Sequence, residues 1–250
     1  METITSLQNP RVRAWKGLKD RKGRRETGCF LVEGRKSVAE ALESGFTVET
    51  LLLTEAQADL AVPAGIPVCL LPEHVMAAVC DTKTPQGAAA VVRMREQPLT
   101  GRRLAVLDGV QDPGNVGTIL RTADAAGLDG ALLSADCADP YSPKVLRATM
   151  GSVFHLPFRV TDDLPGELAH LREERGIPVL SSQLDGTPFD AFRPGPTGFA
   201  LVIGSEGNGV TPAVRALADR RLCLPMRGRA ESLNAAVAAG IMMYSLMREA

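Results

Sequence analysis

The stretch LAVLDGVQDPGNVGTILRTADAAG, residues 104–127, joins a run of apolar residues to a helical pattern through a short loop. Near-continuous apolar strands such as residues 104–109 are typical of parallel sheets, in which both faces of a strand are buried. The Pro-Gly pair in the loop favours a turn, Asn115 is a residue type that caps helices, and Gly127 is suited to end one. A buried strand followed at once by a helix predicts an α/β fold.

Predicted strands and helices alternate on both sides of this stretch. Downstream, the strands are expected at residues 130–134, 152–158, 178–183, 199–204 and 221–225, and the helices at residues 142–150, 163–175 and 211–218. Upstream, the strands are expected at residues 29–34, 48–54, 66–71 and 87–93, and the helices at residues 35–45 and 72–79. The downstream alternation predicts an open, mostly parallel sheet, whose ligands lie outside the carboxyl ends of the strands.

A polar segment that contains proline and glycine, MREQPLTGRR at residues 94–103, separates the two groups of strands. Its composition suits a linker, so we expect two domains, residues 1–97 and residues 104–250.

The bulk composition is that of a globular protein. Apolar residues make up 45% of the 250 residues and charged residues 23%, and no run of about 18 apolar residues could cross a bilayer. The first residues lack the apolar core of an export signal, so we expect a soluble, cytoplasmic protein. The five cysteines and three histidines are scattered without the spacing of metal ligands. We therefore expect buried thiols and no metal.

Basic residues are concentrated at the N-terminus. Residues 1–36 hold ten Lys or Arg against four acidic residues, a balance of +6, while the whole chain carries −1. Such a segment suits contact with the phosphates of a nucleic acid, and Trp15 beside it could stack on bases. The alternative is a solvated helix face. The candidate nucleic-acid-binding residues are Arg11, Arg13, Lys16, Lys19, Arg24, Arg25 and Arg35.

Two further strand ends carry unusual loops. The strand at residues 199–204 is followed by SEGNGV, in which Glu206 stands among glycines that permit a tight turn or close approach to a ligand. The last predicted strand leads into residues 224–246, LPMRGRAESLNAAVAAGIMMYSL. There Ser232 is a candidate N-cap, and Asn234 would fall inside the first turn, where asparagine is a poor helix former. The helix that follows is small and apolar on nearly all faces, which predicts burial against the sheet and against a second subunit.

Arg121 needs a separate explanation. Its spacing predicts that it lies in the apolar stripe of the helix over residues 117–126, where a solvated cation would be poorly placed. It either bonds to carbonyls or carboxylates at a domain edge or faces an anionic substrate.

Taken in order, the three loop segments resemble the motifs of the SpoU, or TrmH-like, family of SPOUT RNA methyltransferases. The first motif corresponds to residues 115–127, the second to residues 201–210 and the third to residues 224–240. Residues 141–158 also resemble the family. FLVEGRKSVAEAL, at residues 30–42, resembles less specifically the small domain that many members carry in front.

The resemblance implies a fold and an activity. The implied fold is α/β, with a C-terminal trefoil-knot domain built on a mostly parallel sheet and preceded by a small, ribosomal-protein-like substrate-binding domain. The implied activity is S-adenosylmethionine-dependent 2′-O-ribose methylation of structured RNA by a homodimer that forms through the C-terminal domain. Ribosomal RNA is favoured as the substrate. The alternatives are transfer RNA, or a non-catalytic RNA-binding or ribosome-assembly module on the same scaffold.

The resemblance also implies roles for individual residues. The implied catalytic set is Arg121, Asn115, Glu206, Ser232 and Asn234. The implied cofactor-binding set is Gly204, Leu224, Met226, Leu233 and Ser232. Because a guanidinium is effectively always protonated, Arg121 is expected to hold a phosphate and stabilise an alkoxide more readily than to act as a base.

Overall fold

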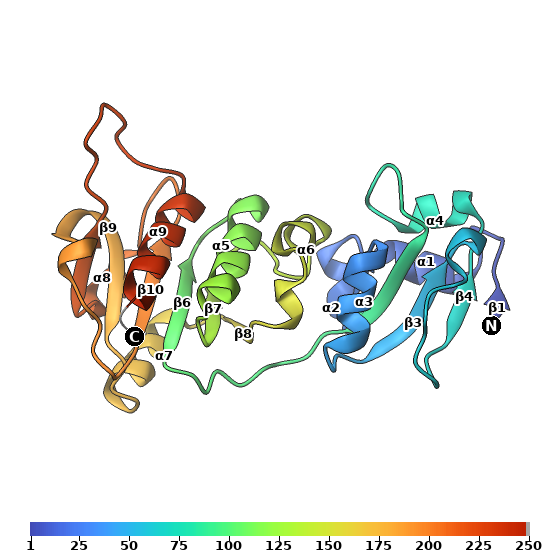
Figure 1. The fold of residues 1–250 in the computed structure, drawn as a ribbon, viewed down its shortest axis with the longest axis horizontal. Helices are drawn as coiled ribbons and strands as arrows, with labels where there is room; N and C mark the ends of the chain where they lie inside the picture. The colour runs from blue at the N-terminus through green and yellow to red at the C-terminus, as the bar shows by residue number, and fades with distance from the viewer. Residues whose placement is uncertain (249–250) are drawn as a thin grey trace. The chain divides into compact units, whose positions relative to one another are not determined.

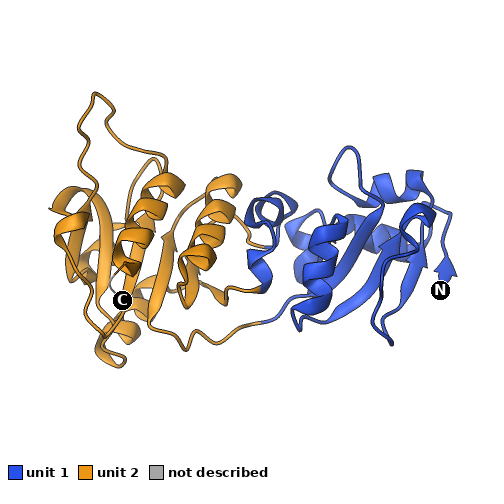
Figure 2. Ribbon diagram, viewed as in Figure 1, with its two compact units in different colours: residues 1–95, 141–154 blue, residues 96–140, 155–250 orange. Residues whose placement is uncertain are grey.

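The computed structural model describes residues 1–248, and the chain forms two compact units (Figure 2). The first unit contains Met1–Arg95 together with Tyr141–Phe154, and the second contains Glu96–Pro140 and the chain from His155 onward. The chain therefore passes from the first unit to the second near the expected linker, returns for one short segment, and then completes the second unit.

The sheet of the first unit is mixed. Its strand order is β1-β4-β3-β5-β2, and β5 runs antiparallel to both of its neighbours. The strands are β1 (Glu2–Thr3), β2 (Cys29–Glu33), β3 (Val48–Leu53), β4 (Val68–Leu70) and β5 (Ala88–Arg93). The helices are α1 (Pro10–Gly17), α2 (Arg21–Thr27), α3 (Arg35–Glu43), α4 (Glu73–Val79) and α6 (Pro143–Thr149), with short 3₁₀ turns η1 (Glu55–Gln57) and η2 (Ser152–Phe154) (Figure 1).

An aromatic cluster explains why residues 141–154 belong to the first unit. The Phe30 ring on β2 lies 4.6 Å from the Tyr141 ring, and the Phe46 ring lies 5.3 Å from the Phe154 ring, measured between centroids. Phe30 is fully buried and Phe154 is 5% exposed. Residues 152–158 were expected to be a strand, and this prediction was wrong for most of the segment. Residues 152–154 form the 3₁₀ turn η2, which places Phe154 in this core, and β8 begins only at Phe158.

The sheet of the second unit is entirely parallel, with strand order β11-β9-β10-β6-β7-β8. The strands are β6 (Arg103–Asp108), β7 (Gly130–Ser134), β8 (Phe158–Thr161), β9 (Val179–Pro188), β10 (Phe199–Gly204) and β11 (Arg220–Cys223). The helices are α5 (Pro113–Ala126), α7 (Leu164–Glu173), α8 (Pro212–Leu217) and α9 (Ala235–Met247), with the 3₁₀ turn η3 (Phe189–Ala191).

Both faces of the central strands are covered. Leu104 and Val106 of β6 share one core cluster with Leu168 of α7 and Val214 of α8. Because side chains alternate along a strand, Ala105 and Leu107 point to the other face, and both are buried. Helices α5 and α9 pack side by side there, in contact with β6 and β10 respectively (Figure 1). The apolar run at residues 104–109 is thus the doubly buried strand that its sequence predicts.

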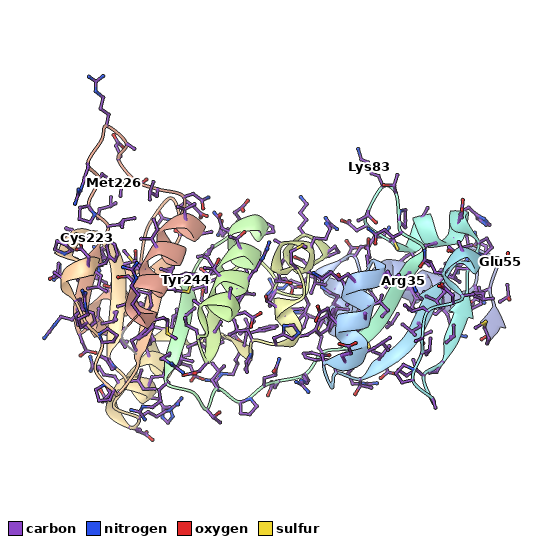
Figure 3. The ribbon with its side chains drawn as sticks, viewed as in Figure 1. Arg35, Glu55, Lys83, Cys223, Met226 and Tyr244 are labelled. Atoms are coloured by element: carbon purple, nitrogen blue, oxygen red, sulfur yellow. The ribbon has the colours of Figure 1, made fainter. Side chains whose placement is uncertain are left out.

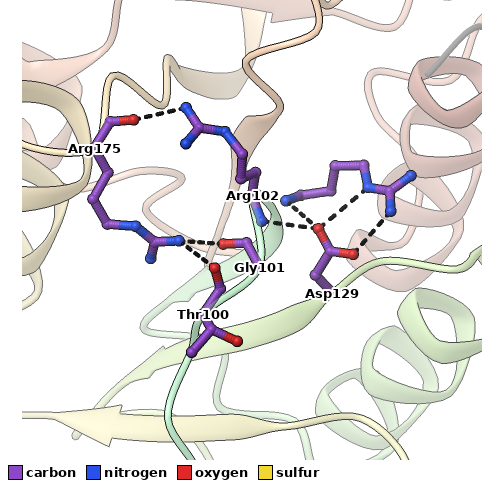
Figure 4. Close-up of polar contacts among 6 residues, drawn as sticks. Thr100, Gly101, Arg102, Asp129 and Arg175 are labelled. Carbon is purple, nitrogen blue, oxygen red and sulfur yellow. Dashed lines mark hydrogen bonds and ion pairs between the residues drawn. The ribbon is translucent and has the colours of Figure 1, made fainter.

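Two arginines fasten the chain where it enters β6 (Figure 4). The guanidinium of Arg175 donates to the carbonyl of Thr100 at 2.8 Å and also to that of Gly101. The side chain of Arg102 donates to the carbonyls of Arg175 at 2.7 Å and Thr197 at 2.8 Å. These bonds fix the amino-terminal end of β6, the end opposite the loops that follow the parallel strands.

Asp129 completes this anchor. Its carboxylate accepts hydrogen bonds from the backbone N–H groups of Arg102 at 2.9 Å and Arg103 at 2.8 Å, and from the Arg103 guanidinium at 2.9 Å (Figure 4). Burial alone would raise the pKa of Asp129, but these hydrogen bonds outweigh it and hold the pKa below its ordinary value.

The cysteines are free thiols, and four of the five are buried. Burial raises the pKa of Cys80 to about 12. Within residues 1–248, no helix is both long and apolar enough to cross a membrane. In the same part of the chain, no group of three or more His, Cys, Asp or Glu side chains is arranged to hold a metal ion.

Candidate functional site

A cavity of about 610 Å³ opens at the carboxyl edge of the parallel sheet. Its walls come from the end of β9, from the loop after β10 and from the loop that joins β11 to α9, on which Figure 3 labels Met226. The residues of the cavity that the sequence predicted are Gly204, Glu206, Leu224, Met226, Ser232, Leu233 and Asn234. Three loops distant in sequence therefore contribute to one site region, as expected for a parallel sheet.

Asn115 links two of these loops to the start of α5. Its side-chain nitrogen donates to the carboxylate of Glu206, and its side-chain oxygen accepts from the Asn234 amide nitrogen at 2.9 Å. Asn115 is 8% exposed, so both polar ends of its amide are satisfied by the two partners rather than by bulk water. The structure brings together three members of the implied catalytic set.

The helix caps differ from those expected. Asp112, not Asn115, caps α5, because its carboxylate accepts from the backbone N–H of Asn115 at 2.8 Å. Asn234, not Ser232, caps α9, accepting from the backbone N–H groups of Ala236 at 3.0 Å and Val237 at 3.2 Å. The prediction that Asn234 lies inside the first turn of this helix was therefore wrong, because it precedes the first turn as the N-cap. Ser232 lies before the helix, and it lines the cavity.

Gly204 is required by the loop that follows it. A Cβ at this position would lie 2.1 Å from the carbonyl carbon of Gly209 and 2.2 Å from the backbone nitrogen of Val210. The loop closes through two backbone hydrogen bonds between Ser205 and Gly209, at 2.9 and 3.1 Å. This close return holds Glu206 at the tip of the turn, beside Asn115.

The structure does not place Arg121 in the cavity. Arg121 is exposed, and the expectation that it lies within the apolar stripe of α5 was wrong. At 100° per residue it lies about 140° around the helix from the buried Val116, so it points away from the sheet. This position leaves its guanidinium open to a ligand or partner that approaches from outside the chain.

The basic N-terminal residues divide into buried and exposed groups. Arg24 is 3% exposed and donates to the carbonyls of Leu18 and Lys19, both at 2.8 Å, so the prediction that it contacts RNA was wrong. Its guanidinium satisfies carbonyls at the end of α1 instead. Trp15 is 6% exposed, and stacking on bases was therefore also a wrong expectation.

The other predicted RNA-binding residues have charged groups that are partly or fully exposed. Arg11 pairs with Glu2 at 2.6 Å, and Lys19 donates to the carbonyl of Ala78 at 2.9 Å. Arg35, labelled in Figure 3, pairs with Asp59 at 3.1 Å. Three of the set, Arg13, Lys16 and Arg25, are exposed helix residues.

The cavity suits a ligand that is partly apolar and partly charged. Ile203, Leu224, Met226, Leu233 and Met242 supply apolar wall, while Asp185, Glu206 and Arg215 supply charges of both signs. Its size is in the range of small-molecule sites. Sequence reasoning missed Gln183, Asp185 and Arg215. Gln183 and Asp185 could have been found from their position, since they stand at the carboxyl end of a predicted strand, where ligands of a parallel sheet bind.

Comparisons with known proteins agree with this architecture. Residues 102–244 match the model of the SpoU rRNA Methylase family, and residues 9–90 match the MRM3-like substrate binding domain. The 23S rRNA (guanosine(2553)-2′-O)-methyltransferase RlmP of Bacillus subtilis is 43% identical, over 98% of this chain and 99% of that protein. A 23S rRNA (uridine(2479)-2′-O)-methyltransferase of Streptomyces viridochromogenes is 34% identical, over 98% of this chain and 92% of that protein.

A solved structure extends the likeness to the cofactor. The AdoMet-bound rRNA methyltransferase from Sinorhizobium meliloti superposes with a TM-score of 0.86 at 34% identity, covering 99% of this chain and 97% of that one.

Proposed function

This chain belongs to the SpoU rRNA methylase family and is an S-adenosylmethionine-dependent RNA 2′-O-methyltransferase, and we propose that its acceptor is a ribose of 23S ribosomal RNA. Two relatives that span almost the whole chain are named for 2′-O-methylation of 23S rRNA, which supports this substrate over transfer RNA. Their names specify a guanosine and a uridine, so they share the ribose chemistry and differ in the base. The likeness to these two relatives over almost the whole chain carries the proposed substrate. The Asn115–Glu206–Asn234 cluster beside the cavity carries the assignment of the reacting edge.

The residues of the cavity fit the methyl donor. S-adenosylmethionine, when bound, supplies a methyl group on a positively charged sulfur. We assign its binding to Gly204, Leu224, Met226, Leu233 and Ser232, which combine apolar surface with a hydroxyl. The carboxylates of Asp185 and Glu206 suit the positive charges of such a ligand, and Arg215 suits its carboxylate. Charges of both signs beside apolar walls are the chemistry that this donor requires.

The acceptor side is assigned to the polar cluster and to Arg121. Asn115 and Asn234, held by each other and by Glu206, orient the ribose so that its 2′-oxygen faces the donor. Glu206 and Ser232 stand on the same edge and complete the set that positions the hydroxyl. Arg121 binds the adjacent RNA phosphate and stabilises the charge that develops on the oxygen, since its guanidinium stays protonated.

A homodimer through the second unit is part of this proposal. Helix α9 leaves Val237 51%, Ile241 39% and Tyr244 52% exposed, although its opposite face is buried (Tyr244 is labelled in Figure 3). Intervals of four and three residues put these side chains on one stripe. Apolar side chains grouped in this way are typical of a protein interface. In this dimer, the exposed Arg121 of one chain reaches the cavity of the partner chain.

RNA contacts are assigned to the domain at residues 1–97, and methyl transfer to the domain at residues 104–250. Within the first, the exposed cations Arg13, Lys16 and Arg25 carry the proposal, because their charge is accessible to phosphates. Arg11, Lys19 and Arg35 contribute less, since each already bonds to a carboxylate or a backbone carbonyl of the chain.

The test is methyl transfer to a panel of RNAs by the wild type and by Arg121→Ala. The wild type is expected to methylate a ribose 2′-hydroxyl of 23S rRNA, and not 16S rRNA or transfer RNA. The Arg121→Ala variant should lose about 10²-fold or more in rate while it keeps its melting temperature and its cofactor affinity, because Arg121 is exposed on α5. Arg220→Ala, at an exposed arginine of β11, is the matched control and should retain activity.

Other outcomes would contradict the proposal separately. Methylation of transfer RNA alone would overturn the substrate, and unchanged turnover in Arg121→Ala would remove Arg121 from the mechanism. A chain that neither binds the cofactor nor modifies any RNA would be the non-catalytic module.

A further inference from the structure

A second cavity, of about 390 Å³, lies within the first unit and shares no residue with the cavity at the edge of the parallel sheet. It opens beside the end of β3, between η1, α4 and the loop that leads into β5. Its size is in the range of small-molecule sites. Among the described residues that line it, only Glu73 is charged, so the cavity is lined mainly by neutral polar and apolar groups.

Thr54 places an unpaired hydroxyl in the wall of this cavity. The residue is only 7% exposed, and its hydroxyl makes no hydrogen bond with any described residue. Its oxygen is not one of the fully enclosed polar atoms of the described chain, so it is accessible from the cavity that Thr54 lines. Buried polar groups in native structures are hydrogen-bonded as a rule. A hydroxyl that is sheltered from bulk water and still unpaired therefore points to a ligand.

Gly87 keeps this hydroxyl clear. Its φ of 78° lies in the left-handed region, and a Cβ there would collide with the Thr54 hydroxyl oxygen and lie 3.1 Å from Cγ of Gln57. The amide of Gln57 is held from the other side, because its Oε1 accepts from the Arg35 guanidinium at 2.8 Å. This hydrogen bond leaves the amide N–H groups of Gln57 as donors for another partner.

The loop that leads into β5 forms the opposite wall, and the first unit holds it firmly. The carboxylate of Glu33 accepts from the backbone N–H groups of Asp81 at 2.7 Å and Thr82 at 3.1 Å. The side chain of Asp81 pairs with Arg147 of α6 at 2.8 Å. Lys83 stands on the crest of this loop, points away from the chain, and has no ion pair within the described residues (Figure 3). The cavity is thus preformed, with an unpaired cation beside it.

The chemistry of the cavity fits an unstacked nucleobase. Proteins read the bases of single-stranded RNA through hydrogen bonds to their edges and through contacts with their flat faces. Thr54 and Gln57 supply neutral hydrogen-bonding groups, and Met76 and Pro85 supply apolar surface. A free nucleotide would need a cation inside the cavity for its phosphate, whereas the charged lining residue, Glu73, is acidic. In RNA, the phosphate beside the base lies outside the cavity, where Lys83 stands.

We propose that this cavity holds one unpaired nucleobase of the substrate RNA, with the Thr54 hydroxyl and the Gln57 amide at its edge and Lys83 on the neighbouring phosphate. Residues 9–90 match a substrate binding domain, which supports RNA as the occupant. The inference rests on the proposed function for the identity of that RNA. Because the reacting ribose lies at the other cavity, this site selects the RNA and takes no part in methyl transfer.

Paired glutamate substitutions test whether RNA occupies the cavity. Ala56 and Ala58 are both exposed and lie two residues apart, and only Ala56 lines the cavity. Ala56→Glu should weaken the binding of 23S rRNA by at least about 10-fold, since its carboxylate would stand where the base lies. Ala58→Glu adds the same charge outside the cavity, where salt screens it, and should change the Kd by less than about 2-fold. Filter binding with S-adenosylhomocysteine present measures both.

Thr54→Val separates binding from a structural role. Valine keeps the shape of threonine and removes a hydroxyl that has no partner in the chain, so the melting temperature should stay the same or rise. The Kd for 23S rRNA should nevertheless weaken about 5-fold, the effect of one lost hydrogen bond. Thr54→Ser keeps the hydroxyl and should bind as the wild type does. Chemical probing of base edges should show a nucleotide that the wild type and Thr54→Ser protect and Thr54→Val leaves exposed.

Salt dependence separates the base from its phosphate. Lys83→Ala should lower the slope of log affinity against log salt by about one, whereas Thr54→Val should leave the slope unchanged. An unchanged slope in Lys83→Ala would remove the phosphate contact from the proposal.

Equal affinities of Ala56→Glu and Ala58→Glu for 23S rRNA, or full protection of the same bases by Thr54→Val, would overturn the nucleobase site and leave the methyltransferase assignment intact. A wild type that methylates no 23S rRNA would instead overturn the proposed function. If Ala56→Glu fails to fold, the comparison of Thr54→Val with Thr54→Ser still decides.

Discussion

Asn234 makes two kinds of hydrogen bond with one small amide. Its oxygen caps α9 by accepting from two backbone N–H groups, and its nitrogen donates to Asn115 at 2.9 Å. The first role concerns the stability of a helix, and the second concerns the geometry of the candidate site. Only asparagine among the good N-cap residues has both an acceptor and a side-chain N–H donor. This double demand explains why an asparagine stands at the mouth of an apolar helix.

The two roles can be separated by paired substitutions. Asn234→Asp keeps the acceptor that caps the helix but cannot donate to Asn115, whereas Asn234→Ala loses both. Both variants should therefore lose methyl transfer by at least about 10-fold, the effect of one lost positioning hydrogen bond. In urea unfolding, Asn234→Ala should be less stable than Asn234→Asp by about 1 kcal/mol, the usual value of an N-cap. A fully active Asn234→Asp would show that donation to Asn115 is not needed.

At the level of single residues, the sequence predicted which loops carry the site better than it predicted each residue's role. Asn115, Glu206 and Asn234 follow from strand-end position and from the family resemblance together, and the structure joins them. The caps were assigned to the wrong residues because Asp112 and Asn115 are both good capping types three positions apart. Arg24 looked like a surface cation, since composition cannot reveal that carbonyls of α1 surround it.

At the scale of elements, strand β6 is anchored at its start by the ionised side chain of Asp129. Asp129 binds two successive backbone N–H groups and the Arg103 guanidinium, so its ionised form is stabilised in the folded chain. The resulting pKa lies below the ordinary value, and a depressed carboxyl pKa adds stability above the pKa of the unfolded chain, about 3.9. That contribution is lost as the pH falls through the lower, folded pKa.

Asp129→Asn should therefore destabilise the second unit in a pH-dependent manner. At pH 7 the free energy of unfolding should fall by about 1.5–3 kcal/mol, the value of hydrogen bonds to a charged group. The difference from the wild type should stay constant down to about pH 5 and shrink below about pH 4. Urea unfolding across this range measures it, with Asp162→Asn, an exposed aspartate of the same unit, as the control. A difference that grew on acidification would contradict the assignment.

At the scale of elements, apolar runs predicted strands well where both faces of the strand are buried. The pattern was misleading at residues 152–158, where apolar residues alternate with polar ones but Gly151, with φ of 101°, starts a turn. Val153 and Phe154 are buried by a 3₁₀ turn against the first unit's aromatic core. An alternation of apolar and polar residues predicts that the apolar side chains are buried, but it does not predict in which core they are buried.

At the scale of the whole molecule, the change of composition at residues 94–103 predicts a linker, but no change of composition predicts that residues 141–154 belong to the first unit. Their place in that unit depends on rings, Phe30 with Tyr141 and Phe46 with Phe154, that are far apart in the sequence. The trefoil knot implied by the family resemblance stays a prediction of kinship, because no local pattern encodes the threading of a chain.

The exposed stripe on α9 makes a prediction about assembly. Ile241 lies at its centre, between Val237 and Tyr244, and is 39% exposed, so a glutamate there would be tolerated by a single chain but would bury a charge in a dimer. Ile241→Glu should therefore stay folded, with an unchanged far-UV spectrum, while light scattering coupled to size exclusion gives the mass of one chain in place of two. Its methyl transfer should fall with the dimer fraction, because Arg121 lies outside the cavity of its own chain. Val160→Glu, at an exposed apolar residue of β8, is the control and should leave the mass unchanged. An active, monomeric Ile241→Glu would show that one chain completes the site alone, and a dimeric one would place the interface on another surface.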